Sequence, residues 1–308
     1  MGKIMIHICA FYIFKPLLAQ EVSQLKLELE QMAANQALRG LVLLGREGIN
    51  FTISGTATGL EAFKAWLTTR MHLTQPHFKD SLSLKHPFHV FKVKVKKEIV
   101  SLGQPGLVPD SLKNGHVSPA EWQGKLHSGE AVVLDVRNDY EVEIGKFTNA
   151  VDLGINEFQN FPARLQQSGI SKDREVLIYC TGGIRCEKAI LEMKRQGYER
   201  VQQLEGGILN YLKEFPQAGF EGECFVFDYR VAVDQQLAPT QTYKLCAHCG
   251  QPSAQEVNCS LCHKDGVVCG HCIERGINTC SKNCANHARL GSESRRPHLQ
   301  ELRKRHRL

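Results

Sequence analysis

The sequence of 308 residues predicts a multidomain protein that combines α+β and α/β architecture. Residues 1–100 alternate amphipathic strands with two helical patterns, as α+β domains do. Residues 113–216 instead contain short, fully apolar strands of the kind that is buried in a parallel sheet. A third region, residues 217–288, is rich in cysteine, and a basic tail follows at 289–308.

The first region gives six elements in the order β-α-β-β-α-β. We expect them at residues 4–14, 19–37, 41–44, 49–54, 58–69 and 88–96. Val22, Leu25 and Leu29 lie at helical spacing in the first helix, and a GREG sequence turns the chain between the second and third strands. This order is typical of a ferredoxin-like, or acylphosphatase-like, fold, in which an antiparallel sheet has both helices on one side.

The last of these strands alternates apolar and basic residues, so one of its faces is exposed to solvent. Its basic residues, including one just beyond its end, are Lys92, Lys94, Lys96 and Lys97. A positive face of this kind either docks RNA or is an ordinary solvated surface, and both interpretations fit the pattern equally well.

Gly and Pro residues at 101–112 predict a linker to the second domain. In that domain Ser118 is the expected N-cap of a helix that has Pro119 at its first position. Strands are expected at 131–136 and 176–180, with helical patterns between them. The second domain is therefore an α/β unit.

The sequence VLIYCTGGIRCEKA places Cys180 between a buried strand and a helix. The loop that follows comprises Thr181, Gly182, Gly183, Ile184 and Arg185. Its backbone N–H groups are expected to surround the sulfur, with the helix N-terminus behind them. The helix dipole and Arg185 both favour the thiolate, so we expect Cys180 to have a lowered pKa and to be a nucleophile.

The residues around Cys180 are also compatible with two other interpretations. A buried structural cysteine before a glycine turn is the first. A protein-phosphatase loop is the second, and the spacing argues against it, because that loop needs arginine six residues after the cysteine. Here the sixth position is Cys186 and the arginine is at the fifth.

Residues near the loop are candidates for supporting roles. Asp135 ends a predicted strand and either orients the loop, orients Arg137, or lies in a surface turn. Cys186 lies one turn into the helix and either resolves an oxidised Cys180 as a disulfide or packs as a small apolar residue. We interpret Arg137 and Glu141 as structural.

Eight cysteines in the third region form four closely spaced pairs. They are Cys246 with Cys249, Cys259 with Cys262, Cys269 with Cys272, and Cys280 with Cys284. Thiolates at this spacing suit tetrahedral Zn²⁺, so the eight would fill up to two structural sites, with His248, His263 and His271 as substitute ligands. Metal would then supply the folding energy of a segment that is poor in large apolar residues. An iron–sulfur cluster and metal-free, reduced cysteines are the alternatives.

The net charge of +6 is concentrated in the tail, where seven Lys or Arg residues stand against two Glu. Such a tail suits a polyanion such as RNA, and a solvated, disordered end is the alternative. No apolar run is long enough to span a membrane, and the apolar N-terminus lacks a signal-peptide cleavage pattern. With twelve cysteines and no export signal, we expect a protein of the reducing cytoplasm that does not bind membranes.

Three segments together resemble a rhodanese domain: LDVRNDYEVEIGKFTNAV, YCTGGIRCEKA and LEGGILNYL. In this resemblance Asp135 matches the aspartate of the D-V-R motif and Cys180 matches the loop cysteine. The G-G-I segment of the family corresponds to Gly206, Gly207 and Ile208.

Departures from the usual rhodanese motifs indicate which group of rhodanese-related proteins the sequence resembles. G-K-F at 145–147 stands where rhodaneses usually have G-H-I. Together with CTGGIRCEKA at 180–189, GREGIN at 45–50 and VKKEIVSLG at 95–103, it resembles the rhodanese-related tRNA uridine hydroxylases. In those proteins a ferredoxin-like domain precedes the rhodanese domain and a cysteine-rich segment often follows, so the resemblance covers nearly all of the chain before the tail. Phe51 departs from this pattern, because glycine is expected after G-I-N.

The resemblance implies oxygen-dependent 5-hydroxylation of uridine at the wobble position of tRNA, with molecular oxygen as co-substrate and Cys180 as the essential residue. The residues alone indicate a thiolate that either carries sulfur as a persulfide or adds to an electrophilic carbon. A persulfide sulfurtransferase is therefore the alternative enzyme. A third hypothesis is a zinc-dependent RNA-binding scaffold without enzymatic activity. The intact cysteine loop argues against this hypothesis. Nothing in the sequence indicates an obligate protein partner.

Overall fold

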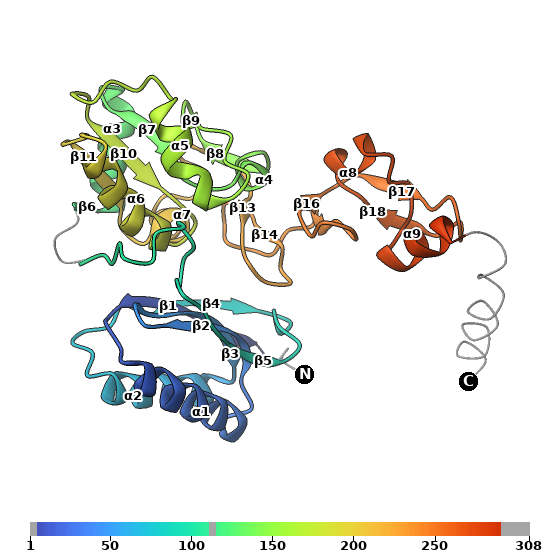
Figure 1. Cartoon of the computed structure of the whole chain (residues 1–308), viewed down its shortest axis with the longest axis horizontal. Coiled ribbons are helices and arrows are strands. Elements are labelled where there is room, and N and C mark those ends of the chain that lie inside the picture. Colours follow the sequence, from blue (N-terminus) through green and yellow to red (C-terminus); the bar gives the residue numbers. More distant parts are fainter. Residues whose placement is uncertain (1–4, 111–114, 291–308) are drawn as a thin grey trace. The chain divides into compact units, whose positions relative to one another are not determined.

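The computed structural model describes residues 5–110 and 115–290 (Figure 1). The chain divides into two compact units, one that ends at Pro239 and one that begins at Thr240. The predicted basic tail lies outside the described residues from position 291 onward.

The first domain of the first unit is a five-stranded sheet with both helices on one side; four of its strands are antiparallel, as predicted, and the fifth is parallel to its neighbour (Figure 1). Its elements are β1 (Ile6–Phe14), α1 (Ala19–Asn35), β2 (Arg39–Gly45), β3 (Gly48–Gly55), α2 (Ala57–Arg70), β4 (Lys79–Ser83) and β5 (Phe91–Val95). The strand order is β4-β1-β3-β2-β5, in which the first four strands are antiparallel neighbours. This order of the first four strands is that of the ferredoxin-like fold.

The fourth strand of that fold is not the one that the sequence predicted. The predicted strand at 88–96 gives β5, which pairs in parallel with β2 as an added fifth strand. The strand that completes the fold is β4, which pairs with β1 at the opposite edge. Its sequence, KDSLS, is short and polar, so it lacks the apolar alternation by which strands are found.

The two faces of this sheet differ. The helix-covered face holds the core, in which Phe51 packs between Phe11 and Phe63 with ring centroids 5.6 and 5.5 Å apart. The departure at Phe51 therefore adds an aromatic ring to the core. Tyr12, two strand positions from Ala10, belongs to the opposite face, because side chains alternate along a strand.

The second domain is a parallel sheet with helices on both faces, as predicted. Its elements are β6 (His116–Val117), α3 (Pro119–Ser128), β7 (Val132–Asp135), α4 (Asp139–Val142), β8 (Gly145–Phe147), β9 (Val151–Asp152), η2 (Phe158–Asn160), α5 (Phe161–Gln166), β10 (Val176–Tyr179), α6 (Ile184–Arg195), β11 (Val201–Leu204) and α7 (Gly207–Glu214). The parallel strands lie in the order β6-β11-β10-β7-β9. Ser118 caps α3 and Pro119 follows it, which confirms the predicted helix start.

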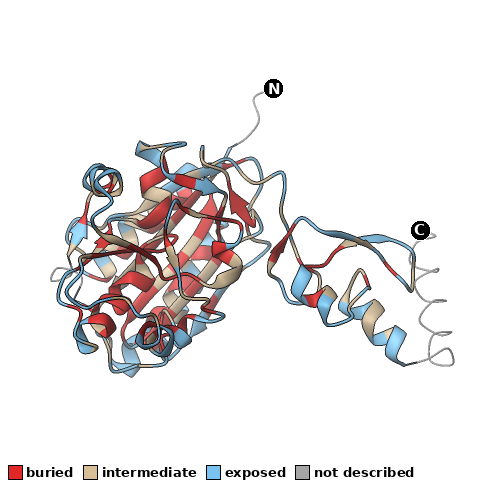
Figure 2. Cartoon of the chain, turned by 90° about the horizontal axis from the view of Figure 1, so that it is seen from above, coloured by how far each residue is buried: buried red, intermediate tan, exposed pale blue. Residues whose placement is uncertain are grey.

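Two segments that the sequence placed outside this domain pack against it. Leu102 of the predicted linker is buried in the core beside α6. The chain after α7 forms β12 (Phe220–Gly222), which pairs with β8, and the pair β13 (Cys224–Phe225) and β14 (Ala232–Val233). Buried residues are concentrated in the central strands of both sheets (Figure 2).

The second unit has little apolar core. Its described elements are β15 (Lys244–Leu245), β16 (Pro252–Ser253), β17 (Glu256–Asn258), β18 (Asp265–Val267), α8 (Gly270–Glu274) and α9 (Lys282–Arg289). Val268 is buried among cysteines, with Val257, Ile273 and Ile277 partly buried around it. Among the described residues of the whole chain, no helix is long and apolar enough to cross a membrane.

Candidate active site

Cys180 follows β10, a central strand of the parallel sheet, and its side chain is buried. The carboxyl ends of parallel strands are where α/β domains bind ligands. The N–H of Gly183 donates a hydrogen bond to Cys180 Sγ at 3.1 Å. Gly183 has φ of +97°, and a Cβ there would lie 2.9 Å from the Tyr12 hydroxyl, so both the backbone angle and the space require glycine.

The surroundings of Cys180 lower its pKa to about 5. Burial acts in the opposite direction and is the largest influence. It is outweighed by a hydrogen bond from Cys186, the charge of Arg185, and the N–H groups of Arg185 and Gly182. Burial and the neighbouring sulfur raise the pKa of Cys186 well above its ordinary value. The pair is therefore a thiolate that accepts a hydrogen bond from a thiol.

Arg185 is held in place by Glu141 of α4. Its Nη1 and Nη2 lie 2.5 and 2.8 Å from the two carboxylate oxygens of Glu141. The Thr181 hydroxyl donates to the same carboxylate at 3.2 Å. Glu141, which the sequence indicated as structural, thus fixes the cation beside the thiolate and one side chain of the loop.

Asp135 is buried and binds Arg137, with Arg137 Nη2 2.7 Å from Asp135 Oδ2. Arg137 also donates to the carbonyls of Gly145 at 2.6 Å and Glu141 at 3.3 Å. Of the roles considered for Asp135, the geometry favours the orientation of Arg137, which connects α4 to β8.

The G-G-I segment lies against the cysteine loop. The N–H of Ile208 donates to the Cys180 carbonyl at 3.0 Å, and the N–H of Leu209 donates to the Thr181 carbonyl at 3.2 Å. A Cβ on Gly207 would lie 2.5 Å from the Cys180 carbonyl oxygen. Glycine is required there because the start of α7 approaches the loop this closely.

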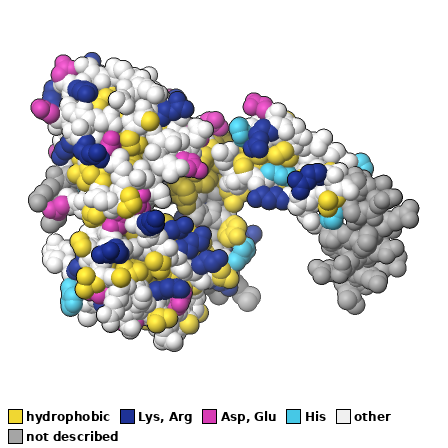
Figure 3. Space-filling model, viewed as in Figure 1, with side chains coloured by type: hydrophobic (Ala, Val, Ile, Leu, Met, Phe, Trp, Pro, Cys, Tyr) yellow, Lys and Arg dark blue, Asp and Glu magenta, His cyan; other side chains and the backbone are white. Residues whose placement is uncertain are grey.

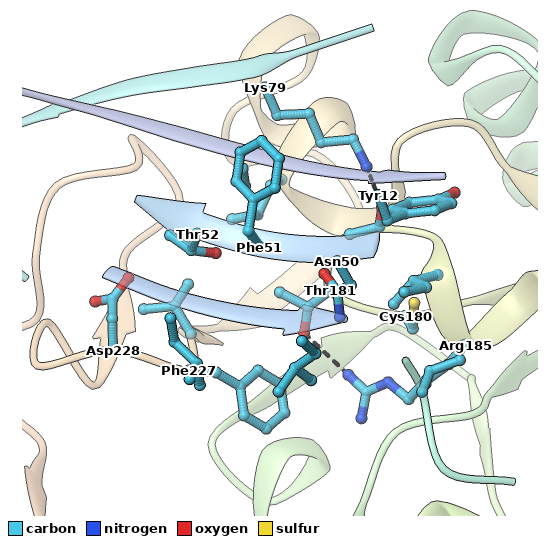
Figure 4. A pocket seen from close by; sticks show the side chains of 18 of the residues that line it. Tyr12, Asn50, Phe51, Thr52, Lys79, Cys180, Thr181, Arg185, Phe227 and Asp228 are labelled. Atoms are coloured by element: carbon cyan, nitrogen blue, oxygen red, sulfur yellow. Dashed lines mark hydrogen bonds between the residues drawn. The ribbon is translucent and has the colours of Figure 1, made fainter. Parts of the chain in front are cut away.

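A pocket of about 620 Å³ in the first unit brings Cys180 together with residues from distant parts of the sequence (Figure 4). The helix-free face of the first domain contributes Tyr12 and Asn50, and the thiol loop contributes Thr181 and Arg185. The segment after β13 contributes Phe227, Asp228 and Arg230. A pocket of this size accommodates a small organic molecule or a nucleobase.

Lys79 is a pocket residue that sequence reasoning missed, because its strand, β4, was missed. Its Nζ donates to the Gly182 carbonyl in the thiol loop and lies 4.8 Å from the centroid of the Tyr12 ring. Burial lowers the pKa of Lys79 to about 8, although Cys180 and Glu187 attract its charge. The first domain thus places a cation beside the thiolate.

Three of the motifs that resemble the hydroxylases meet in one buried ion cluster. Lys188, from IRCEKA, has its Nζ 2.8 Å from Glu47 of GREGIN and 2.7 Å from Glu98 of VKKEIVSLG. All three side chains are buried. The cluster connects the first domain and the segment after β5 to α6, the helix that follows the thiol loop.

The eight cysteines of the second unit form two groups of four, and the groups interleave along the chain. One group is Cys246, Cys249, Cys269 and Cys272, and the other is Cys259, Cys262, Cys280 and Cys284. Within each group the sulfur atoms all lie within 4.8 Å of one another. Neither group contains a histidine among the described residues, so none of the three histidines considered as substitutes is in this donor set.

The sulfur positions fit one tetrahedral ion in each group. Sulfurs bound to a single zinc lie about 3.8 Å apart, because each Zn–S bond is about 2.3 Å. Here Cys249 and Cys269 sulfurs are 3.4 Å apart, and Cys280 and Cys284 sulfurs are 3.7 Å apart. In an iron–sulfur cluster the four thiolates bind two or four different irons, so some of their sulfur atoms lie further apart than the atoms that share a single metal ion.

Comparison with known proteins gives matches along most of the chain. A UPF0176 acylphosphatase-like domain matches residues 6–99, a rhodanese-like domain matches 118–214 and a rhodanase C-terminal domain matches 221–285. A Bdellovibrio bacteriovorus protein named tRNA uridine(34) hydroxylase is 47% identical over 285 residues, which are 91% of this chain and 80% of that protein.

Solved structures match about a third of this chain. The rhodanese-like domain of an Anabaena protein is 21% identical and covers 35% of this chain and 80% of its own, with a TM-score of 0.31. A rhodanese-like domain protein from Staphylococcus aureus is 24% identical and covers 32% of this chain and 90% of its own, with a TM-score of 0.28.

Proposed function

Because the chain belongs to the tRNA uridine(34) hydroxylase family, we propose that it hydroxylates C5 of uridine 34 in tRNA, with Cys180 as the reacting residue. The observation that carries the proposal is the 47% identity to the Bdellovibrio protein over 91% of the chain. Molecular oxygen is the co-substrate, tRNA is the partner, and the cytoplasm is the location that this substrate implies.

The lowered pKa of Cys180 supports its role, because the thiolate is the nucleophilic form. In one route the sulfur adds to C6 of the uracil ring, which makes C5 nucleophilic toward an oxygen donor. A new C5–O bond then forms, the C5 proton leaves, and the thiolate departs from C6. In a second route a persulfide or peroxy species on Cys180 takes part in the oxidation. Insertion of one oxygen atom from O₂ also requires two electrons from a reductant, which reduce the other oxygen atom to water.

Each region has a part in this proposal. Residues 1–100 dock RNA, and residues 113–216 provide the thiolate and its loop, namely Thr181 to Arg185 with Asp135 and Cys186 in support. Residues 217–288 hold up to two structural zinc ions through the eight cysteines. The spacing of the sulfur atoms supports zinc there.

A persulfide sulfurtransferase is the second candidate, because the N–H groups around Cys180 Sγ would also hold a persulfide. Thiosulfate:cyanide sulfurtransferase activity of the purified protein measures this activity directly. For the hydroxylase, that activity is expected to be weak and independent of tRNA.

The proposed function is tested by mass spectrometry of nucleosides from tRNA. Cells in which Cys180→Ser is the sole copy should lack 5-hydroxyuridine. Cys9→Ala is the control, because Cys9 is a buried thiol of the first domain whose pKa is raised by burial. A normal level of 5-hydroxyuridine in the Cys180→Ser cells would refute the role of Cys180.

A further inference from the structure

Two exposed aromatic side chains lie beside the pocket. Phe227 and Tyr229, in the segment after β13, each have 58% of their surface exposed. The other exposed large apolar side chains among the described residues are Met, Leu or Val and carry no ring. Phe227 itself lines the pocket with Cys180 and Arg185 (Figure 4).

The ring of Phe227 is exposed but fixed. It packs edge-on against Phe225, with ring centroids 5.1 Å apart and planes at 89°. The guanidinium of Arg185 lies 5.5 Å from its centroid. The backbone around it is held by the ion pair of Asp228 and Arg230 at 2.6 Å. A rigid ring costs little conformational entropy when a ligand stacks on it.

Tyr229 is held against the first domain. Its N–H donates to the Pro87 carbonyl at 3.0 Å, and its ring lies 4.3 Å from the ring of His89. The Arg230 guanidinium also reaches the Ser81 hydroxyl at 3.4 Å. The segment from 227 to 230 therefore connects the second domain to the chain around β4.

The charges around these rings favour an anionic ligand. The lining of the pocket includes Lys79, Lys96 and Lys213, none of which has a carboxylate partner in the described part of the chain. Of the carboxylates in the same lining, Asp80, Glu98 and Asp228 are neutralised by other cations, and Glu157 is the remaining acidic residue. On the face seen in Figure 3, Lys and Arg side chains gather in the middle of this unit. Fixed aromatic rings combined with cations are the features with which proteins bind unpaired nucleotides.

We propose that Phe227 and Tyr229 form a stacking platform for two consecutive unpaired bases of an RNA loop. Phe227 stacks on the base that enters the pocket beside Cys180, and Tyr229 stacks on an adjacent base. Lys96 and Lys213, which line the pocket without a carboxylate partner in the described part of the chain, contact the phosphates between and beside them. This proposal rests on the proposed function for the identity of the ligand, which is tRNA. It concerns RNA binding and can be tested without the hydroxylation step.

Binding of a fluorescently labelled RNA stem-loop with uridine at position 34 tests the platform. Phe227→Ala and Tyr229→Ala should each weaken binding by ~5- to 100-fold, as expected for the loss of one base–aromatic stack. Leu27→Ala is the control, because Leu27 is a comparably exposed apolar residue on α1 and should leave the affinity unchanged. Unfolding midpoints of all variants establish that the fold is retained.

Two further variants separate stacking from general hydrophobic contact. Phe227→Leu keeps an apolar side chain without a ring and should bind as weakly as Phe227→Ala. Phe227→Trp should restore the affinity, and its added fluorescence should be quenched by the stem-loop. Wild-type affinity of Phe227→Leu, or equal weakening by Leu27→Ala, would overturn the platform.

Failures of the platform and of the proposed function give different results. If wild-type protein hydroxylates the stem-loop and both alanine variants bind it normally, the platform alone is wrong. If wild-type protein binds through the two aromatic residues but yields no 5-hydroxyuridine, the hydroxylase proposal is wrong and the platform stands. If wild-type protein does not bind the stem-loop, both are wrong.

Discussion

Cysteine serves two different purposes in the two units. Cys180 accepts hydrogen bonds from backbone N–H groups and from the Cys186 thiol, and Arg185 lies beside it. These groups stabilise the thiolate without forming a covalent or coordinate bond to the sulfur, so the thiolate can still react as a nucleophile. The eight cysteines of the second unit lie in groups of four, where a shared metal ion would take up the electron pairs of the sulfur atoms. The groups around a sulfur atom, more than the sulfur itself, therefore determine its chemical role.

The units also differ in what holds them together. The first unit has extensive apolar clusters and buried ion pairs, such as Lys188 with Glu47 and Glu98. Residues 240–290 of the second unit contribute a small cluster, in which Val268 and three cysteines are the buried members. Burial stabilises the first unit, and metal is expected to stabilise the second.

The largest predicted effect is that of metal removal. A chelator should unfold the described part of the second unit, because structural zinc contributes about 10 kcal/mol or more to folding. The first unit should keep its structure. Hydrogen exchange measured by mass spectrometry, together with the zinc content per chain, checks this difference. Unchanged exchange in residues 240–290 after complete chelation would show that the cysteine groups fold without metal.

The next largest effect is expected from Lys188→Met. The variant leaves Glu47 and Glu98 buried without their cation, which should cost about 3–5 kcal/mol of unfolding free energy. Lys194→Met is the matched control, because Lys194 is an exposed residue of the same helix. Urea denaturation of both variants measures the difference. A cost below 1 kcal/mol for Lys188→Met would mean that the ion cluster does not stabilise the first unit.

The pH dependence of Cys180 reactivity should distinguish it from an ordinary thiol. Alkylation of Cys180 is expected to be half-maximal near pH 5 and almost constant from pH 6.5 to 8, because the thiolate form loses its charge only as pH falls through its pKa of about 5. Arg185→Gln removes a positive charge and should shift the midpoint to higher pH, whereas Arg195→Gln, on the exposed end of α6, should not. Peptide mass spectrometry measures the alkylation rate of Cys180 at each pH in the wild-type protein and in both variants. A rate that rises tenfold per pH unit between 6 and 8 in wild-type protein would contradict the lowered pKa.

The smallest effect is expected from Tyr12→Phe. This change removes the hydrogen bond from the Tyr12 hydroxyl to Glu187 Oε1 at 3.1 Å. His116 Nε2 lies 3.1 Å from the same oxygen and continues to contact it. The loss should therefore be about 1 kcal/mol in urea denaturation. If Tyr12→Phe lowered the unfolding free energy as much as Lys188→Met does, the expectation that His116 compensates for the lost hydrogen bond would be wrong.

The sequence was sufficient to predict the fold class, the helix start at Ser118 and the placement of Cys180 between strand and helix. These features depend on local periodicity, capping and glycine, all of which are visible within about a dozen residues. The two interleaved cysteine groups were not predictable in the same way. The spacing within the pairs does not determine which two pairs share a group.

Lys79 and Phe227 show where sequence reasoning failed at the pocket. Lys79 lies on a polar edge strand whose pairing with β1 has no signature in its own residues. Phe227 looks like any other apolar residue until the fold leaves it exposed beside Cys180. Both come to the pocket through contacts between segments that are far apart in the sequence, and local patterns do not encode such contacts.

The cluster of Lys188, Glu47 and Glu98 has a consequence for how this protein can be divided or recombined. Here both carboxylates that neutralise a buried lysine of α6 come from outside residues 113–216. A piece cut at residue 113 would carry that lysine without its partners. The rhodanese domain of this chain is therefore not an interchangeable module, and exchange of its N-terminal neighbour requires Glu47 and Glu98 to be transferred with it.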